Sequence, residues 1–143
     1  MINMPRSTDL FVDTAGWVPS LYAQDPLHDT VARIMEEAVR DGRRLNSTNY
    51  VITEIVPLFS RFRFSRSALV AAVNAMRANP HVLLLHVDEA TDAEAWSLLA
   101  ARLDKSWSLV DATSFVVMRR FGIGEAQTTD HHFEQAGFTC LPA

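Results

Sequence analysis

Short apolar runs alternate along the chain with segments in which apolar residues recur at helical spacing. Leu10–Val12 and Val82–Val87 are apolar runs, the second interrupted only by His86, and such runs are typical of strands buried in a parallel sheet. Weaker extended segments lie at about residues 44–48 and 125–128. This alternation predicts an α/β fold with three layers, α/β/α, around a mostly parallel sheet of roughly four to five strands.

Polar residues, proline and glycine mark where the helices begin and end. The Asp25–Pro26 pair predicts a helix start, because proline is favoured in the first turn. Thr91–Glu94 and Ser108–Asp111 both have the spacing of a capping box, in which two side chains satisfy free backbone N–H groups. Gly122 is expected to end the helix that begins after Ser108.

Length, charge and cysteine content limit the class of protein. A chain of 143 residues fits one domain, and we expect residues 1–143 to form it, with residues 1–8 as a flexible polar tail. The net charge of −4 argues against a broad basic surface for nucleic acid. Cys140, the single cysteine, has no partner for an internal disulfide, which favours the reducing cytoplasm. No apolar run is long enough to span a membrane.

Four acidic residues stand where strands give way to helices. Asp13 follows the first strand, Glu54 lies on the helix after the second, Asp111 opens a helix, and Asp130 follows the segment at 125–128. Functional groups collect at the carboxyl ends of strands in such sheets, so these acids are expected to share one crevice. Clustered carboxylates repel one another and imply a cation, and oxygen ligands suit Mg²⁺ or Mn²⁺. Asp9 precedes the first strand and is expected at the surface.

The same acids lie in four strings that resemble a known family. FVDT, NYVITE, DKSWSLVDATSF and TTDHHFEQAGF are similar to segments of PIN-domain ribonucleases, and most of all to VapC-type toxins of toxin–antitoxin pairs. The resemblance runs from Leu10 to Leu141, and its two C-terminal strings are the most specific. It implies a PIN-like fold and metal-dependent endonucleolytic cleavage of RNA.

The resemblance also assigns roles to residues. Asp13 and Asp111 would bind the metal ion directly, and Glu54 and Asp130 would complete the catalytic cluster. Three neighbouring hydroxyl groups are candidates to orient the carboxylates, namely Thr14, Ser108 and Thr129.

Two further surfaces are expected near Glu54. RNA contact is predicted at the basic residues that follow its helix, namely Arg61, Arg63 and Arg66. A cognate antitoxin is predicted to bind apolar side chains beside them, namely Leu58, Phe59 and Phe62. The resemblance further implies a homodimer.

Two alternatives stay open beside the toxin interpretation. One is a stand-alone RNA-processing nuclease, and the other is a PIN-like module that binds RNA or protein without catalysis. The presence of all four acids speaks against the second. The His131–His132 pair does not indicate zinc by itself, because neighbouring helical residues point different ways and no third histidine or cysteine stands at ligand spacing.

Overall fold

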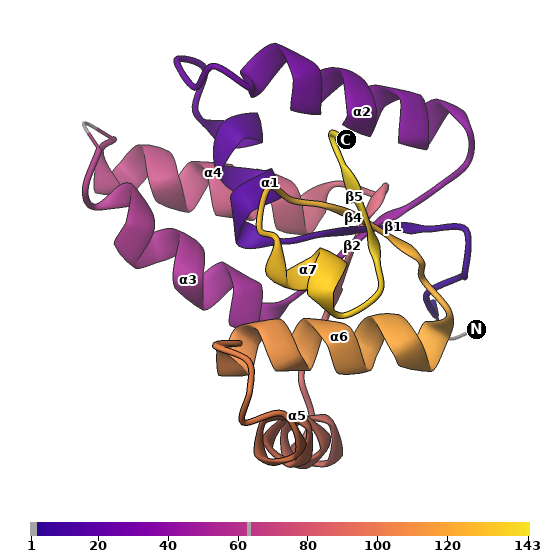
Figure 1. Ribbon diagram of the computed structural model, residues 1–143. Helices are drawn as coiled ribbons and strands as arrows, with labels where there is room; N and C mark the ends of the chain where they lie inside the picture. Colours follow the sequence, from indigo (N-terminus) through magenta and orange to yellow (C-terminus); the bar gives the residue numbers. More distant parts are fainter. Residues whose placement is uncertain (1–2, 63) are drawn as a thin grey trace.

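The computed structural model describes residues 3–62 and 64–143, and Figure 1 shows its arrangement. One five-stranded sheet has the order β3-β2-β1-β4-β5, with every neighbouring pair parallel. Its strands are β1 (Leu10–Val12), β2 (Leu45–Thr48), β3 (Val82–Leu85), β4 (Glu125–Gln127) and β5 (Thr139–Leu141). The predicted α/β/α architecture with a parallel sheet is confirmed.

Helices cover both faces of this sheet. Those of the described residues are α1 (Thr14–Leu21), α2 (His28–Arg40), α3 (Asn49–Phe59), α4 (Arg66–Ala78), α5 (Glu89–Ala101), α6 (Leu109–Phe121) and α7 (His132–Gln135). In Figure 1, α1 and α2 lie on one side of the sheet, while α6 and α5 lie on the other. Within residues 3–62 and 64–143, no helix has the length and apolar character needed to cross a membrane.

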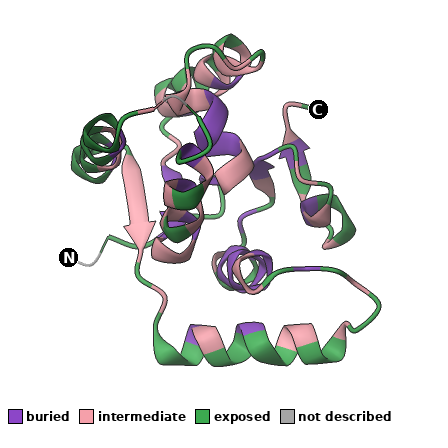
Figure 2. Ribbon diagram, turned by 90° about the vertical axis from the view of Figure 1, so that its left-hand side faces the viewer, coloured by how far each residue is buried: buried purple, intermediate pink, exposed green. Residues whose placement is uncertain are grey.

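Helix α6 is the central support of the second face. The predicted capping box is confirmed, because Ser108 Oγ accepts from Asp111 N while Asp111 Oδ2 accepts from Ser108 N, each at 3.0 Å. Gly122 ends the helix in the left-handed region at φ 70°, where glycine carries no steric penalty. Residues 111–118 are all buried, since the sheet covers one side of α6 and α5 the other (Figure 2).

Several element boundaries differ from the predictions. Helix α2 begins at His28, because Asp25 Oδ1 accepts from Leu27 N at 2.8 Å and closes a turn before it. Helix α5 is capped by Asp88, whose Oδ1 accepts from Thr91 N at 2.8 Å, so the predicted capping box at Thr91 was wrong. Strand β3 is shorter than expected and only half-buried, since it lies at an edge of the sheet.

The segment before β1 is attached to the body of the protein through Asp9. This carboxylate is 1% exposed, so its expected place at the surface was wrong. It accepts from Arg6 N at 2.9 Å and Arg44 N at 3.0 Å, and it pairs with the Arg44 guanidinium at 3.2 Å. Arg44 thereby links the start of β2 to the residue before β1.

Candidate active site

All four predicted acids line one pocket of about 350 Å³ at the carboxyl end of the sheet. Asp13 follows β1 directly, Asp111 lies in the first turn of α6, and Asp130 lies three residues beyond β4. Glu54 reaches the pocket from the middle of α3. The full lining is Asp13, Thr14, Ala15, Glu54, Leu58, Ser106, Ser108, Asp111, Asp130 and His132.

A close contact between α1 and β4 sets the position of Asp13. A Cβ atom on Gly16 would lie 2.1 Å from the carbonyl oxygen of Gln127, so glycine alone allows this approach. The Gln127 side chain completes the contact, because its Nε2 donates to the Gly16 carbonyl at 3.1 Å. Since Val12 pairs with Gln127 in register, the next residues of both strands, Asp13 and Thr128, stand side by side.

The hydrogen bonds of each acid fall on one of its two carboxylate oxygens. Asp13 Oδ2 accepts from Thr128 Oγ1 at 3.2 Å, and Glu54 Oε1 accepts from Thr14 Oγ1 at 2.7 Å. Asp130 Oδ1 accepts from the backbone N–H of His132 at 2.9 Å. The protein thus holds each of these carboxylates by one side.

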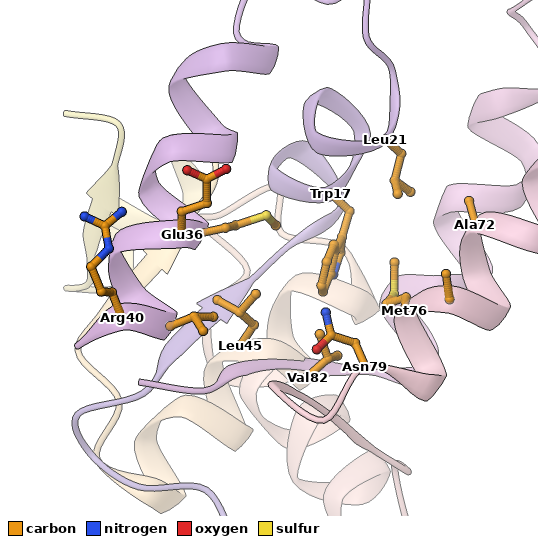
Figure 3. Close-up of a pocket in the computed structure, with 12 residues that line it drawn as sticks. Trp17, Leu21, Glu36, Arg40, Leu45, Ala72, Met76, Asn79 and Val82 are labelled. Carbon is orange, nitrogen blue, oxygen red and sulfur yellow. The ribbon is translucent and has the colours of Figure 1, made fainter. Parts of the chain in front are cut away.

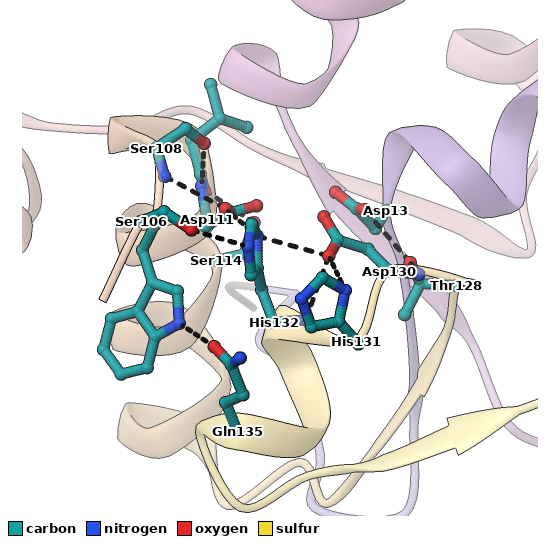
Figure 4. Close-up of polar contacts among 12 residues, drawn as sticks. Asp13, Ser106, Ser108, Asp111, Ser114, Thr128, Asp130, His131, His132 and Gln135 are labelled. Atoms are coloured by element: carbon teal, nitrogen blue, oxygen red, sulfur yellow. Dashed lines mark hydrogen bonds and ion pairs between the residues drawn. The ribbon is translucent and has the colours of Figure 1, made fainter. Parts of the chain in front are cut away.

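The hydrogen bonds of Asp111 also fall on only one of its carboxylate oxygens, and one of its partners is a histidine. Its Oδ2 accepts from Ser108 N, and the Nδ1 atom of His132 lies 3.0 Å from the same oxygen. His132 Nδ1 also lies 3.2 Å from Asp130 Oδ1, so the imidazole bridges two of the acids (Figure 4). The other ring nitrogen, Nε2, is 3.3 Å from Ser106 Oγ.

Burial and mutual repulsion make the pocket unfavourable for so much negative charge. Burial first, and then the charges of Asp111, Glu54 and Asp130, raise the pKa of Asp13 to about 7, against the lowering effect of the Thr14 backbone N–H. Burial likewise raises the pKa of Glu54, with the charges of Asp111 and Asp130 acting in the same direction. No lysine or arginine is among the residues that line the pocket in the described part of the chain.

The Oδ1 atom of Asp13 indicates that the carboxylates of this pocket suit a cation. Asp13 Oδ1 is fully buried, and no described residue donates a hydrogen bond to it. A buried, unpaired carboxylate oxygen is costly unless a positive charge approaches it. Carboxylate oxygens in this arrangement suit a hard divalent ion such as Mg²⁺ or Mn²⁺, which keeps several water ligands.

The supporting hydroxyl groups are partly those expected. Thr14 and Ser108 line the pocket. Thr129 is exposed, and Thr128 makes the contacts expected of it, because its Oγ1 donates to Asp13 and accepts from Asp130 N at 3.0 Å. Sequence reasoning also missed His132. The signal for it was Asp130, since an aspartate often binds the N–H two residues ahead and so draws that residue to its own side.

The predicted RNA and antitoxin surfaces fare differently. Arg61 and Arg66 are exposed, and Arg63 lies outside the described residues. Phe59 is only 1% exposed and packs against the rings of Phe62 and Phe64, so its expected role in partner binding was wrong. Phe62, at 37% exposed, stacks on Tyr22, and Leu58 lines the acidic pocket.

A second, larger hollow of about 700 Å³ lies between α1, α2 and α4 (Figure 3). Trp17, Leu21 and Met76 form much of its apolar wall, and Glu36 and Arg40 from α2 stand at one side. We call it the apolar groove. Its full lining is Trp17, Leu21, Met35, Glu36, Val39, Arg40, Leu45, Ala72, Ala75, Met76, Asn79 and Val82.

Comparison with known proteins finds relatives of this chain in both sequence and structure. The family model described as PIN domain matches residues 10–139. The 23S rRNA-specific endonuclease VapC20 of Mycobacterium tuberculosis is 35% identical over 129 residues, which cover 90% of this chain and 95% of the relative. A crystal structure of Mycobacterium tuberculosis VapC20, described as a sarcin–ricin loop cleaving toxin, superposes with a TM-score of 0.78 at 34% identity, covering 92% of this chain and 97% of that one. The structure of FitAcB from Neisseria gonorrhoeae shares the fold, with a TM-score of 0.63 at 14% identity over 92% and 95% of the two chains.

Proposed function

This chain belongs to the PIN-domain family, and from that premise we propose that it is a metal-dependent endoribonuclease, the toxin of a toxin–antitoxin pair. The observation that carries the proposal is the buried Asp13 Oδ1, unpaired among the described residues, in a pocket where three more acids converge. A binding module without catalysis has no need of such an unfavourable cluster of charge.

Mg²⁺ or Mn²⁺ is the cofactor that these oxygens suit. Asp13 and Asp111 would hold the ion, with Glu54 and Asp130 completing the cluster. When bound, such an ion supplies an activated water molecule and offsets charge on the phosphodiester. Thr128 and Thr14 fix the carboxylates of Asp13 and Glu54 through their hydroxyl groups. The pocket holds RNA phosphate only together with the cation, since the carboxylates alone repel it.

The substrate is proposed from the relatives. VapC20 is described as specific for 23S rRNA and as cleaving the sarcin–ricin loop. We take the same structured RNA as the first substrate for this chain and place the reaction in the cytoplasm with the ribosome. The exposed Arg61 and Arg66 are the proposed phosphate contacts, because RNA affinity comes mainly from neutralising the backbone.

The partners are proposed in the same way. We propose a homodimer and a cognate antitoxin protein, and the apolar groove supports the latter, because a partner helix can bury side chains in such a hollow. The rival within the same chemistry is a stand-alone RNA-processing nuclease. Co-expression with the product of an adjacent gene distinguishes the two, since an antitoxin co-purifies and abolishes cleavage.

The decisive experiment is a cleavage assay with a sarcin–ricin stem-loop RNA and a scrambled RNA of equal length. Cleavage is expected with Mg²⁺ or Mn²⁺ and is expected to stop when a chelator is added. Asp104→Asn is the matched control, because Asp104 is an exposed acid paired with Arg102 and is not among the residues that line the pocket. A protein that binds the RNA but cuts no RNA with either metal would refute the nuclease proposal.

A further inference from the structure

Two histidines and an acid gather at the rim of the acidic pocket. One ligand atom from each of Asp130, His131 and His132 can be chosen so that all lie within 4.8 Å of one another. His132 Nδ1 is 3.2 Å from Asp130 Oδ1, and His131 Nδ1 is 3.9 Å from the same oxygen. Asp111 Oδ2, at 3.0 Å from His132 Nδ1, is the next oxygen within reach (Figure 4).

These separations match the distances between neighbouring ligand atoms around one metal ion. An ion bound at about 2.0–2.2 Å to nitrogen and oxygen ligands sets neighbouring ligand atoms about 3.0–3.6 Å apart. The two contacts of His132 already fall in that range. His131 is the member that must move, and its side chain is 72% exposed, so its ring is free to turn.

Rotation of an exposed side chain, not a backbone turn, lets the adjacent histidines reach one ion. His131 is the N-cap residue of α7 and already has helical backbone angles, φ −64° and ψ −14°, but its side chain is exposed and can rotate. The two rings lie with centroids 4.6 Å apart. Ser106 Oγ, at 3.3 Å from His132 Nε2, engages the far nitrogen and leaves Nδ1 facing the carboxylates.

We propose that Asp130, His131 and His132, with Asp111 as a fourth ligand, form a site for a borderline transition-metal ion, of which Zn²⁺ is the physiological candidate. Imidazole nitrogen favours such ions, and affinity for a given nitrogen–oxygen site rises steeply from Mn²⁺ to Zn²⁺. Mg²⁺, which prefers oxygen ligands, gains nothing from the histidines. The site is therefore distinct in chemistry from the all-carboxylate cluster beside it.

Sharing carboxylates gives the site a consequence for the pocket. Asp130 and Asp111 belong to both ligand sets, so Zn²⁺ at the histidines draws on the same two carboxylates and places a second divalent charge next to the ion of the acidic cluster. Zn²⁺ and Mn²⁺ then bind antagonistically, and a transition metal inhibits the nuclease. This second step rests on the proposed function, whereas the zinc site itself does not.

Direct binding tests the site without any cleavage assay. Untagged apo protein is titrated with Zn²⁺ against a chromophoric chelator, and Co²⁺ binding is followed by visible absorption. His131→Ala and His132→Asn are each expected to weaken Zn²⁺ affinity at least tenfold and to change the Co²⁺ spectrum. His132→Asn keeps an amide donor near the position of Nδ1, and His86→Gln removes an exposed histidine elsewhere as the control. Both histidine variants binding Zn²⁺ as tightly as wild type would overturn the proposal.

Antagonism is measured by the electron paramagnetic resonance signal of free Mn²⁺. Zn²⁺ added to Mn²⁺-loaded wild type is expected to release Mn²⁺, and at the same Zn²⁺ concentration His131→Ala is expected to retain it. Zn²⁺ binding without Mn²⁺ release would overturn the shared-carboxylate step. Asp13→Asn separates the two proposals, because it is expected to lose Mn²⁺ binding while keeping Zn²⁺ binding. A chain that binds Zn²⁺ through its histidines but cuts no RNA refutes the nuclease proposal alone.

Discussion

The two ends of strand β1 each carry a buried aspartate, and the two are treated in opposite ways. Asp9, before the strand, is 1% exposed, and Asp13, after it, is 3% exposed. Burial opposes the ionisation of Asp9, yet backbone N–H groups of Arg44 and Arg6 and the Arg44 charge together lower its pKa. No lysine or arginine is among the described residues that line the pocket of Asp13, and burial raises its pKa, together with the nearby acids, to about 7.

The difference separates a structural acid from one that we propose to bind metal. Asp9 receives its positive charge from the chain itself, so its contacts are complete and join the N-terminal segment to β2. Asp13 retains an oxygen that no described residue satisfies, and its neighbours are three further acids. Burial alone therefore does not distinguish the role of Asp9 from that of Asp13. The source of the compensating positive charge does distinguish them.

The largest expected effect is the loss of cleavage in Asp13→Asn. This substitution keeps the shape but removes a proposed metal ligand, and metal-held charge in the transition state is worth several kcal/mol. Cleavage is expected to fall on the order of 100-fold or more, and calorimetric titration is expected to show weakened Mn²⁺ binding. Asp111→Asn, which can still cap α6, is expected to behave alike.

The same substitution is expected to stabilise the metal-free protein, because it removes repulsion inside the cluster. Urea unfolding in chelator measures this. A variant that cleaves like wild type, or that loses activity only because it unfolds, contradicts the assignment of Asp13 to the metal.

Asp9→Asn should give the reverse pattern. It leaves the guanidinium of Arg44, only 16% exposed, without its countercharge, and breaking a buried pair of this kind costs about 3–5 kcal/mol of unfolding free energy. Mn²⁺ affinity and cleavage by the folded fraction are expected to stay at wild-type levels. Loss of Mn²⁺ binding in a folded Asp9→Asn protein would show that the two ends of β1 are not independent.

Local signals explain what was predictable from sequence. Helix α6 begins after Ser108 and ends at Gly122, and the capping rules that predict both ends need no tertiary contact. The meeting of Asp13 with Asp130 follows from the parallel sheet, since both acids stand beyond the carboxyl ends of adjacent strands. The buried face of α3 was read only in part: Val51, Ile55 and Phe59 recur every four residues, yet Phe59 was assigned to a partner surface.

Long-range contacts explain what was not predictable. Asp9 is buried because of Arg44, 35 residues away, and no local pattern announces that pair. Strand β5 and helix α7 are three and four residues long, too short to show a hydrophobic period. Asp88 and Thr91 both offer a capping oxygen to α5, and only the backbone geometry decides between them.

A smaller effect distinguishes the two aspartates by pH. The pKa of Asp13 is raised in the folded protein, so its contribution to stability is present below its ordinary value of 3.8 and is lost as pH rises toward about 7. The pKa of Asp9 is lowered, so its contribution is present above 3.8 and is lost as pH falls.

Urea unfolding of the metal-free proteins at pH 5 and pH 8 measures the difference. The stabilisation by Asp13→Asn relative to wild type is expected to be larger at pH 8 by at least about 1 kcal/mol, since one pKa unit corresponds to about 1.4 kcal/mol. The destabilisation by Asp9→Asn is expected to be the same at both values, because both lie above the titration of Asp9. Equal pH dependence in the two variants would contradict the contrast.

The smallest expected effect comes from the hydroxyl group that holds Asp13. Thr128→Val preserves shape but removes the donor to Asp13 Oδ2 and the acceptor for Asp130 N. Groups that orient metal ligands typically contribute at least tenfold to metal affinity, so Mn²⁺ affinity and cleavage are expected to fall about tenfold. The unfolding free energy is expected to fall by only about 1 kcal/mol. Thr129→Val, the same change one residue on at an exposed position, is the matched control and should leave all three quantities unchanged. If the two variants behave alike, Thr128 does not position the carboxylates. If only Thr128→Val weakens Mn²⁺ binding, Asp13 at one end of β1 is positioned by a neutral hydroxyl donor, whereas Asp9 at the other end is held by the charge of Arg44.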